Sequence, residues 1–228
     1  MKNKVIIGIS AIIVILVMVL FLVSMKTDEP GVQFTEDEVN FKNEYENLNG
    51  TEYKTSILKT ISIPGDNNVK YITEKDILNE INTGDKVIYL GWAECNWCRT
   101  MLPILLETLK ENEIETLYYF NFKELRTAYE LGEDEEKVEI YEELLKIVGE
   151  DINQEFDEES LRSGIKKIVA PTVIFIKDGK YIGLHEKTVD SQTKSSDVLK
   201  EEQEKELKGI YQELIDRLNF EVCVEEGC

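Results

Sequence analysis

Two cysteines three positions apart, Cys95 and Cys98, are the residues of this sequence with the clearest chemical potential. On a helix this spacing places two thiols one turn apart, where they can close to a disulfide and reopen to a dithiol. A thiolate at the start of a helix is stabilised by unpaired N–H groups and by the helix dipole. We therefore expect Cys95 to attack and Cys98, one turn deeper, to resolve the mixed disulfide. This chemistry needs neither a metal nor an organic cofactor.

The segments on either side of the pair predict that geometry. Residues 86–92 (KVIYLGW) form a continuous apolar run, which is typical of a strand buried on both faces. Residues 95–112 carry Met101, Leu102, Leu105 and Leu109 at helical spacing. The cysteine pair is therefore expected where a buried strand ends and a helix begins.

The other apolar patterns predict a mixed α/β domain. Strands are expected at residues 69–72, 116–122, 172–176 and 181–184, and helices at residues 73–83 and 201–218. Strands that alternate with helices are typical of parallel βαβ units. Asp178-Gly179 between the last two apolar runs predicts a hairpin. The order of elements indicates a compact mixed sheet with a closing helix.

Several linked features resemble the thioredoxin family over residues 66–220. Trp92-Ala93-Glu94 leads into the Cys-x-x-Cys, and Pro103 follows Cys98 by five residues, where that family has a proline that kinks its active-site helix. Val169-Ala170-Pro171-Thr172 is similar to the family's cis-proline segment, and Lys177-Asp178-Gly179-Lys180 is similar to its last hairpin. In general appearance the chain looks like extracytoplasmic thioredoxin-like proteins of the bacteriocin-transport-accessory type.

This resemblance implies a thioredoxin-like three-layer α/β/α sandwich with a mixed sheet, and thiol–disulfide oxidoreductase activity on protein thiols or disulfides. It implies that Ala170, Pro171 and Thr172 present their backbone to the substrate chain beside Cys95. Trp97, between the two cysteines, is expected to be exposed and to contact the substrate. The alternative function is a non-catalytic accessory module that binds an exported peptide or a partner protein and keeps Cys95–Cys98 as a structural disulfide.

The chain departs from the family pattern around the cysteines. The family usually has a buried Asp six residues before the first cysteine, where this chain has Tyr89, and a Trp directly before it, where this chain has Glu94. A carboxylate that points at the sulfur would oppose thiolate formation, and Arg99 is expected to offset it in part. Residues 123–167 form a long acidic insertion before the cis-proline strand, expected to fold as helices that cover one edge of the sheet.

Two further cysteines, Cys223 and Cys228, end the sequence. Four cysteines are an even set, so we expect a structural disulfide between Cys223 and Cys228 in an oxidising compartment. Two alternatives stay open: the tail pair exchanges with Cys95–Cys98, or the four thiolates form a zinc site. The favoured interpretation has no metal. The single histidine, His185, supports neither a histidine metal site nor a Cys–His protease arrangement.

Residues 5–24 contain no charged side chain and are long enough to cross a bilayer as a helix. Lys2 and Lys4 precede them, so the positive-inside bias puts residues 1–4 in the cytoplasm and the rest of the chain outside. The alternative is a cleaved signal peptide, which leaves the domain on the same side. We expect a single-pass anchor in the cell membrane.

After the anchor, residues 25–65 are predicted as a stalk and N-terminal extension, with a helix at 34–48, followed by the domain at 66–220 and a tail at 221–228. The formal net charge of −20 argues against nucleic acid as a partner. The expected partners are client proteins with thiols or disulfides and an electron donor in the membrane.

Overall fold

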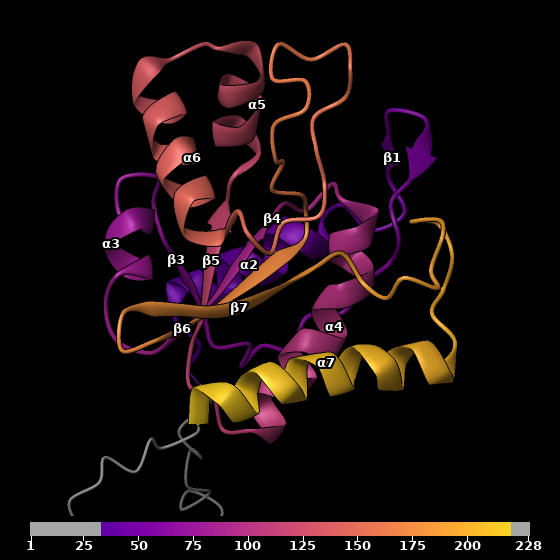
Figure 1. The fold of residues 1–228 in the computed structure, drawn as a ribbon. Coiled ribbons are helices and arrows are strands. Elements are labelled where there is room, and N and C mark those ends of the chain that lie inside the picture. The colour runs from indigo at the N-terminus through magenta and orange to yellow at the C-terminus, as the bar shows by residue number, and fades with distance from the viewer. Residues whose placement is uncertain (1–32, 220–228) are drawn as a thin grey trace, which may run out of the picture. The chain divides into compact units, whose positions relative to one another are not determined.

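The computed structural model describes residues 33–219 (Figure 1), and from Thr35 onward these residues belong to one compact unit. The predicted membrane anchor at residues 5–24, its flanking residues 1–4 and the predicted tail at residues 221–228 lie outside the described residues. Between residues 33 and 219, none of the helices combines the length and the hydrophobicity that a membrane span requires.

A five-stranded mixed sheet forms the centre of the unit, as predicted. Its strands are β3 (Val69–Tyr71), β4 (Lys86–Gly91), β5 (Leu117–Asn121), β6 (Thr172–Lys177) and β7 (Lys180–Glu186), in the order β3-β5-β4-β6-β7. β5 pairs in parallel with both β3 and β4, whereas β6 runs antiparallel to β4 and to β7. A separate two-stranded hairpin joins β1 (Glu52–Tyr53) to β2 (Ser56–Ile57).

Helices lie on both faces of the sheet. They are α2 (Glu36–Glu46), α3 (Ile77–Ile81), α4 (Asn96–Glu111), α5 (Lys123–Leu131), α6 (Glu135–Val148) and α7 (Glu201–Asn219). The connections β3-α3-β4 and β4-α4-β5 run in opposite directions along the sheet, so right-handed crossovers put α3 and α4 on opposite faces. In Figure 1, α5 and α6 lie above the sheet and α3 lies at its left, whereas α7 lies below it and α4 runs down at the right toward α7. The structure is therefore a three-layer α/β/α arrangement.

The turn between β6 and β7 is the predicted Asp-Gly hairpin. Asp178 and Gly179 both have positive φ values, 50° and 67°. A Cβ atom on Gly179 would lie 2.4 Å from the backbone oxygen of Asn82, so only glycine fits there without a shift of the backbone.

Of the predicted stalk and N-terminal extension at residues 25–65, the residues from Thr35 onward pack into the core. Helix α2 starts at a capping box, in which the Thr35 hydroxyl accepts from the Glu38 N–H at 3.2 Å and the Thr35 N–H donates to the Glu38 carboxylate at 2.7 Å. Phe41 and Tyr45 on this helix are both 0 % exposed. Tyr45 also lies under the guanidinium of Arg99, so α2 covers the same face of the sheet as α4.

The insertion at residues 123–167 is only partly helical. It contains α5 and α6, whose Tyr129 and Tyr141 rings stack at 4.2 Å, and then an irregular segment held by isolated bridges between residues 155–156 and 163–166. Helix α6 contacts both α3 and β7. Helix α6 therefore lies against the edge strand β7, as expected for the insertion, and also packs beside α3.

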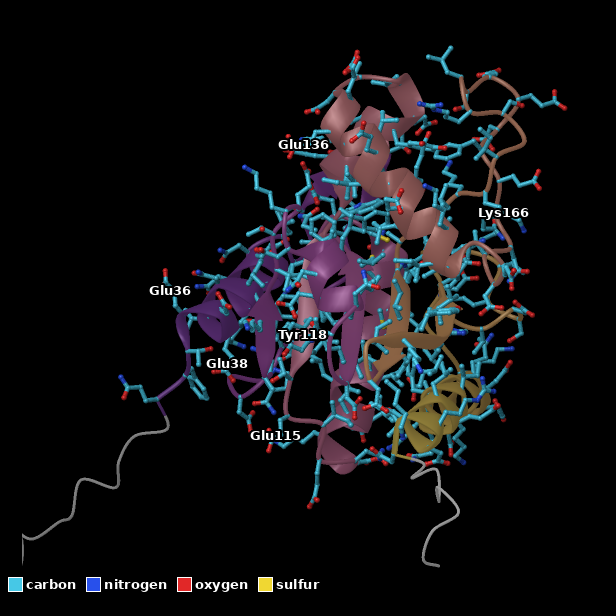
Figure 2. The ribbon with its side chains drawn as sticks, turned by 60° about the vertical axis from the view of Figure 1, so that its left-hand side comes forward. Glu36, Glu38, Glu115, Tyr118, Glu136 and Lys166 are labelled. Carbon is cyan, nitrogen blue, oxygen red and sulfur yellow. The ribbon has the colours of Figure 1, made fainter. Side chains whose placement is uncertain are left out.

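Acidic side chains are distributed widely over the surface. Exposed Glu36, Glu115 and Glu136 lie on well separated parts of the molecule (Figure 2). A distributed negative charge of this kind favours solubility and does not define one binding patch.

If α2 is part of the core, Phe41→Ala should lower the free energy of unfolding by about 3–5 kcal/mol, the usual cost of truncating a buried Phe. Val39→Ala on the same helix is the matched control, because Val39 is 43 % exposed and its change should stay within about 0.5 kcal/mol. Urea unfolding of the reduced full chain measures both. Equal effects of the two substitutions would contradict the packing of α2.

Candidate functional site

Cys95 lies at the predicted junction between a buried strand and a helix. β4 ends at Gly91, and Cys95 is the N-cap of α4, with φ −90° and ψ 112°. Its sulfur accepts a hydrogen bond from the backbone N–H of Cys98 at 3.3 Å. Both cysteines are free thiols in this structure, and Cys98 is 0 % exposed whereas Cys95 is half-buried. The pair therefore presents one accessible sulfur and one sulfur behind it.

The segment at residues 169–172 meets Cys95 across the structure. The Ala170–Pro171 peptide bond is cis, as predicted, and the Cys95 thiol donates to the backbone oxygen of Ala170 at 3.4 Å. Thr172, buried at the start of β6, donates its hydroxyl to the Val169 oxygen at 2.7 Å. Two segments 75 residues apart in the chain thus meet at the sulfur.

The environment of Cys95 favours its thiolate. Burial raises the pKa of Cys95, but hydrogen bonds from the Cys98 thiol and from the backbone N–H groups of Cys98 and Trp97, together with the positive charge of Arg126, outweigh it. The pKa of Cys95 is therefore lowered overall. The backbone donors are those that the first turn of a helix leaves unpaired.

The environment of Cys98 has the opposite effect. Burial raises the pKa of Cys98 far above its usual value, and both the hydrogen bond to Cys95 and the charge of Cys95 raise it further. The Tyr89 hydroxyl and the Trp92 backbone act against this, through hydrogen bonding that lowers the pKa of Cys98. The pair is thus built to hold one thiolate, at Cys95, and one thiol, at Cys98.

The neighbouring charges differ from what the sequence predicts. Glu94 is paired with Lys123, whose Nζ lies 2.7 Å from Oε1 of Glu94. Arg99 does not offset Glu94, because its side chain is buried and donates to the backbone oxygens of Lys59 at 2.5 Å and Ala93 at 2.9 Å. The cation that acts on Cys95 is instead Arg126 of α5, whose guanidinium lies 4.5 Å from the centre of the Trp92 ring.

The N-terminal segment also holds the start of α4. The side-chain amide of Asn96 accepts from the N–H of Lys59 at 2.9 Å and donates to the Ile57 oxygen at 3.1 Å. Asn96 is therefore a buried structural link and not an exposed member of the Cys-x-x-Cys pair. No local pattern in the sequence marks these partners, because they lie about 40 residues away along the chain.

Trp97, which the sequence analysis expects to be exposed, is half-buried and borders a cavity of about 430 Å³. The cavity lies between Trp97, the segment at residues 184–193 and the segment at residues 151–154. Its lining carries the carboxylates of Asp151, Glu186 and Asp190 and one cation, Lys187. This polar cavity, which Trp97 connects to the Cys95–Cys98 segment, offers room for a polypeptide or a side chain.

Within residues 33–219, no group of three or more His, Cys, Asp or Glu side chains could hold a metal ion. Cys223 and Cys228 lie outside the described residues, so their disulfide, their exchange with Cys95–Cys98 and a four-thiolate zinc site stay predictions.

His185 bonds through Nε2 to the Thr188 backbone oxygen at 2.5 Å, and its ring meets Tyr211 edge-on at 5.6 Å. This is a packing role.

A lowered pKa gives Cys95 more thiolate at neutral pH, so it should react with iodoacetamide faster there than a thiol of the unfolded chain. We expect the pH midpoint of its alkylation, measured in full chain carrying Cys223→Ser and Cys228→Ser, to lie below that of the same protein in urea. Arg126→Met should move the midpoint upward, because a favourable charge is lost. Arg162→Met, a cation stacked on Tyr129 instead, is the control and should leave it unchanged. A midpoint equal to that in urea would refute the assignment of Cys95 as the acidic thiol.

No protein-family model matches the chain, and no curated protein matches it in sequence. Among solved structures, the chain is similar to thioredoxin from Aeropyrum pernix, with 14% sequence identity and a TM-score of 0.30 over 52% of this chain and 74% of that one.

Proposed function

We propose that this chain is a thiol–disulfide oxidoreductase that acts on protein thiols or disulfides, with Cys95 as nucleophile and Cys98 as resolving cysteine. The observation that carries the proposal is the environment of the Cys95 sulfur. It lies at the N-cap of α4, accepts the Cys98 N–H at 3.3 Å and lies 3.4 Å from the backbone oxygen of Ala170. Thiolate character and access to a substrate are the two requirements of disulfide exchange.

The reaction proceeds in two exchanges. The Cys95 thiolate attacks one sulfur of a client disulfide, forms a mixed disulfide and releases the other client sulfur as a thiolate. Cys98 then loses its proton and attacks the Cys95 sulfur, which closes the Cys95–Cys98 disulfide and releases the second client thiolate. The dithiol is oxidised by two electrons, and the client disulfide is reduced by the same two. The reverse sequence oxidises a client dithiol.

Trp97, Ala170, Pro171 and Thr172 are the proposed client-binding residues. Ala170 offers its carbonyl beside Cys95, and Trp97, between the two cysteines in sequence, borders the 430 Å³ cavity. A client segment that lies along residues 169–172 would bring its sulfur to Cys95 while its neighbours occupy the cavity. Whether the chain reduces, oxidises or isomerises its clients depends on its reduction potential against that of its compartment.

A membrane anchor and an extracytoplasmic location are part of the same proposal. The support is the uncharged run at residues 5–24 with Lys2 and Lys4 before it. An extracytoplasmic reductant needs a supply of electrons, so an integral membrane protein is the proposed donor. The strongly negative net charge of the chain supports protein clients over nucleic acid.

The second candidate is an accessory module that binds an exported peptide or partner protein and keeps Cys95–Cys98 as a static disulfide. The burial of Cys98 favours it, because a thiol that is 0 % exposed and has a raised pKa resolves mixed disulfides slowly. The two candidates predict opposite results for a trapping experiment.

Cys98→Ser should accumulate mixed disulfides with client proteins, because Cys95 still attacks but no second thiol releases the client. Non-reducing electrophoresis and mass spectrometry of the purified full chain, taken from its native cells, measure this. Cys95→Ser is the matched control and should trap no client. Turnover of a protein disulfide should fall to background in both variants. Absence of Cys95-linked adducts in the Cys98→Ser chain would leave only the accessory module.

The anchor predicts that the full chain stays in the membrane fraction after a high-salt wash, whereas a chain that starts at Thr27 becomes soluble. Centrifugation followed by immunoblotting measures both, and a membrane-impermeant thiol reagent added to intact cells should label Cys95. If the expressed full-length chain is instead recovered in the soluble fraction with its N-terminal segment removed, that segment is a cleaved signal peptide. A Cys95 that is protected until the cells are lysed would contradict the extracytoplasmic location.

A further inference from the structure

Two buried tyrosines, Tyr89 and Tyr45, interact with Cys98. Tyr89, from β4, and Tyr45, from α2, are each 0 % exposed, as is Cys98 itself. The hydroxyl oxygens of the two tyrosines lie 2.7 Å apart, which is a hydrogen bond between side chains 44 residues apart in the chain. Because water does not reach this pair, its two hydroxyl protons can be used only by the groups that surround it.

The Tyr89 hydroxyl is held in one place. A Cβ atom on Gly91 would lie 2.2 Å from that hydroxyl oxygen, so the absence of a side chain at Gly91 makes the room that it occupies. The ring of Tyr89 stacks on Tyr119 of β5 at 5.3 Å with an interplanar angle of 22°. The Tyr45 ring packs against Phe41 at 4.9 Å on one side and under Arg99 at 5.9 Å. Both hydroxyls are therefore fixed by packing before any reaction occurs.

Each hydroxyl has a single proton, and the pair needs only one of them for its mutual bond. When Tyr45 donates to Tyr89, the proton of Tyr89 is free to turn toward the Cys98 sulfur. Burial raises the pKa of Tyr89 and of Tyr45 far above the usual value, so both hydroxyls stay protonated and act as donors, never as bases. A hydrogen bond from Tyr89 is also one of the few influences that lower the pKa of Cys98.

We propose that the Tyr89 hydroxyl donates a hydrogen bond to the Cys98 thiolate in the resolving step, and that Tyr45 is the positioning residue that orients it. The inference rests on the proposed function. The chain has no carboxylate at position 89, and the Tyr89 hydroxyl would stabilise the negative charge of the fully buried Cys98 sulfur.

The step to which this applies follows formation of the mixed disulfide. Once the Cys95 sulfur is bonded to a client sulfur, its negative charge is gone, and with it the largest charge that opposes ionisation of Cys98. Cys98 gives its proton to solvent or to the leaving client thiolate, and its electron pair forms the new S–S bond as the bond from Cys95 to the client breaks. Tyr89 supplies a donor only while Cys98 bears the charge.

The other polar groups around the tyrosines are accounted for. The Tyr119 hydroxyl donates to Glu44 at 2.8 Å, and Tyr71 of β3 donates to the same carboxylate at 2.5 Å. Arg99 of α4 is bonded to backbone oxygens, and Tyr211 of α7 is buried with a hydroxyl that has no hydrogen-bond partner among the described residues. Tyr89 and Tyr45 thus form a hydroxyl pair that is separate from the hydroxyls bonded to Glu44.

A chromogenic aromatic disulfide (dithio-bis-nitrobenzoate) separates the two exchanges in one experiment. With reduced full chain carrying Cys223→Ser and Cys228→Ser, Cys95 releases one coloured thiolate in a first phase, and Cys98 releases a second one when it resolves the adduct. Stopped-flow absorbance across pH gives the rate and the pH midpoint of each phase. The first phase reports the proposed function, and the second reports this inference.

Tyr89→Phe should slow the second phase about tenfold or more near neutral pH and move its midpoint upward, as expected when a charged sulfur loses a hydrogen bond. Tyr45→Phe should move it in the same direction by less. Tyr119→Phe is the matched control, because it removes a buried hydroxyl from the same cluster that bonds to Glu44, and its second phase should match that of the parent.

The outcomes separate the two claims. A parent chain with no first phase would overturn the proposed function, whereas a normal first phase with the same second-phase midpoint in Tyr89→Phe and the parent would overturn this inference alone. If Tyr89→Phe fails to fold, seen as loss of its first phase and of its circular dichroism, the Tyr45→Phe midpoint decides. An unchanged midpoint there would overturn the inference as well.

Discussion

The competition between burial and hydrogen bonding at two sulfur atoms is the constraint on which this structure depends. Burial alone would raise the pKa of both thiols, because a thiolate loses hydration there. Only Cys95 lies where the first turn of α4 leaves N–H groups unpaired. Only its thiolate therefore gains hydrogen bonds that compensate for the lost hydration. One turn deeper, hydrogen bonds from the Tyr89 hydroxyl and the Trp92 backbone do not outweigh burial, and Cys98 keeps its proton. The asymmetry of the pair thus follows from where a helix begins.

The helix start is held in place by parts of the chain that are distant in sequence. The N-terminal segment contributes backbone oxygens to Arg99 and Asn96, and α5 contributes Lys123 to Glu94 and Arg126 to the surroundings of Cys95. The Lys123–Glu94 pair matters because an unpaired carboxylate next to Cys95 would oppose its thiolate. The N-terminal extension and the insertion at residues 123–167 therefore both support the site.

Much of the fold could be predicted from local patterns. The features that were not predicted depend on tertiary contacts. The apolar run at residues 86–92, the Asp-Gly turn and the proline before β6 each act through neighbours along the chain, and each gave the observed element. Helix α2 was predicted, but its burial was not, because its sequence is mostly polar and only Phe41 and Tyr45 reach the core. The partners of Glu94 and Arg99 are set by tertiary contacts that no spacing rule encodes.

Tyr89 shows how a departure from a family pattern acquires meaning only in three dimensions. In sequence it is the absence of a carboxylate. In the structure its buried ring stacks on Tyr119, and its hydroxyl lies beside a second hydroxyl from α2. A carboxylate could take a proton from Cys98 but would repel the resulting thiolate, whereas a neutral hydroxyl cannot take the proton and instead stabilises the charge. A carboxylate would thus assist the loss of the Cys98 proton, whereas the hydroxyl stabilises the thiolate that remains. A site that uses a donor also requires α2 to orient it, so the N-terminal helix and the buried tyrosine form one structural unit.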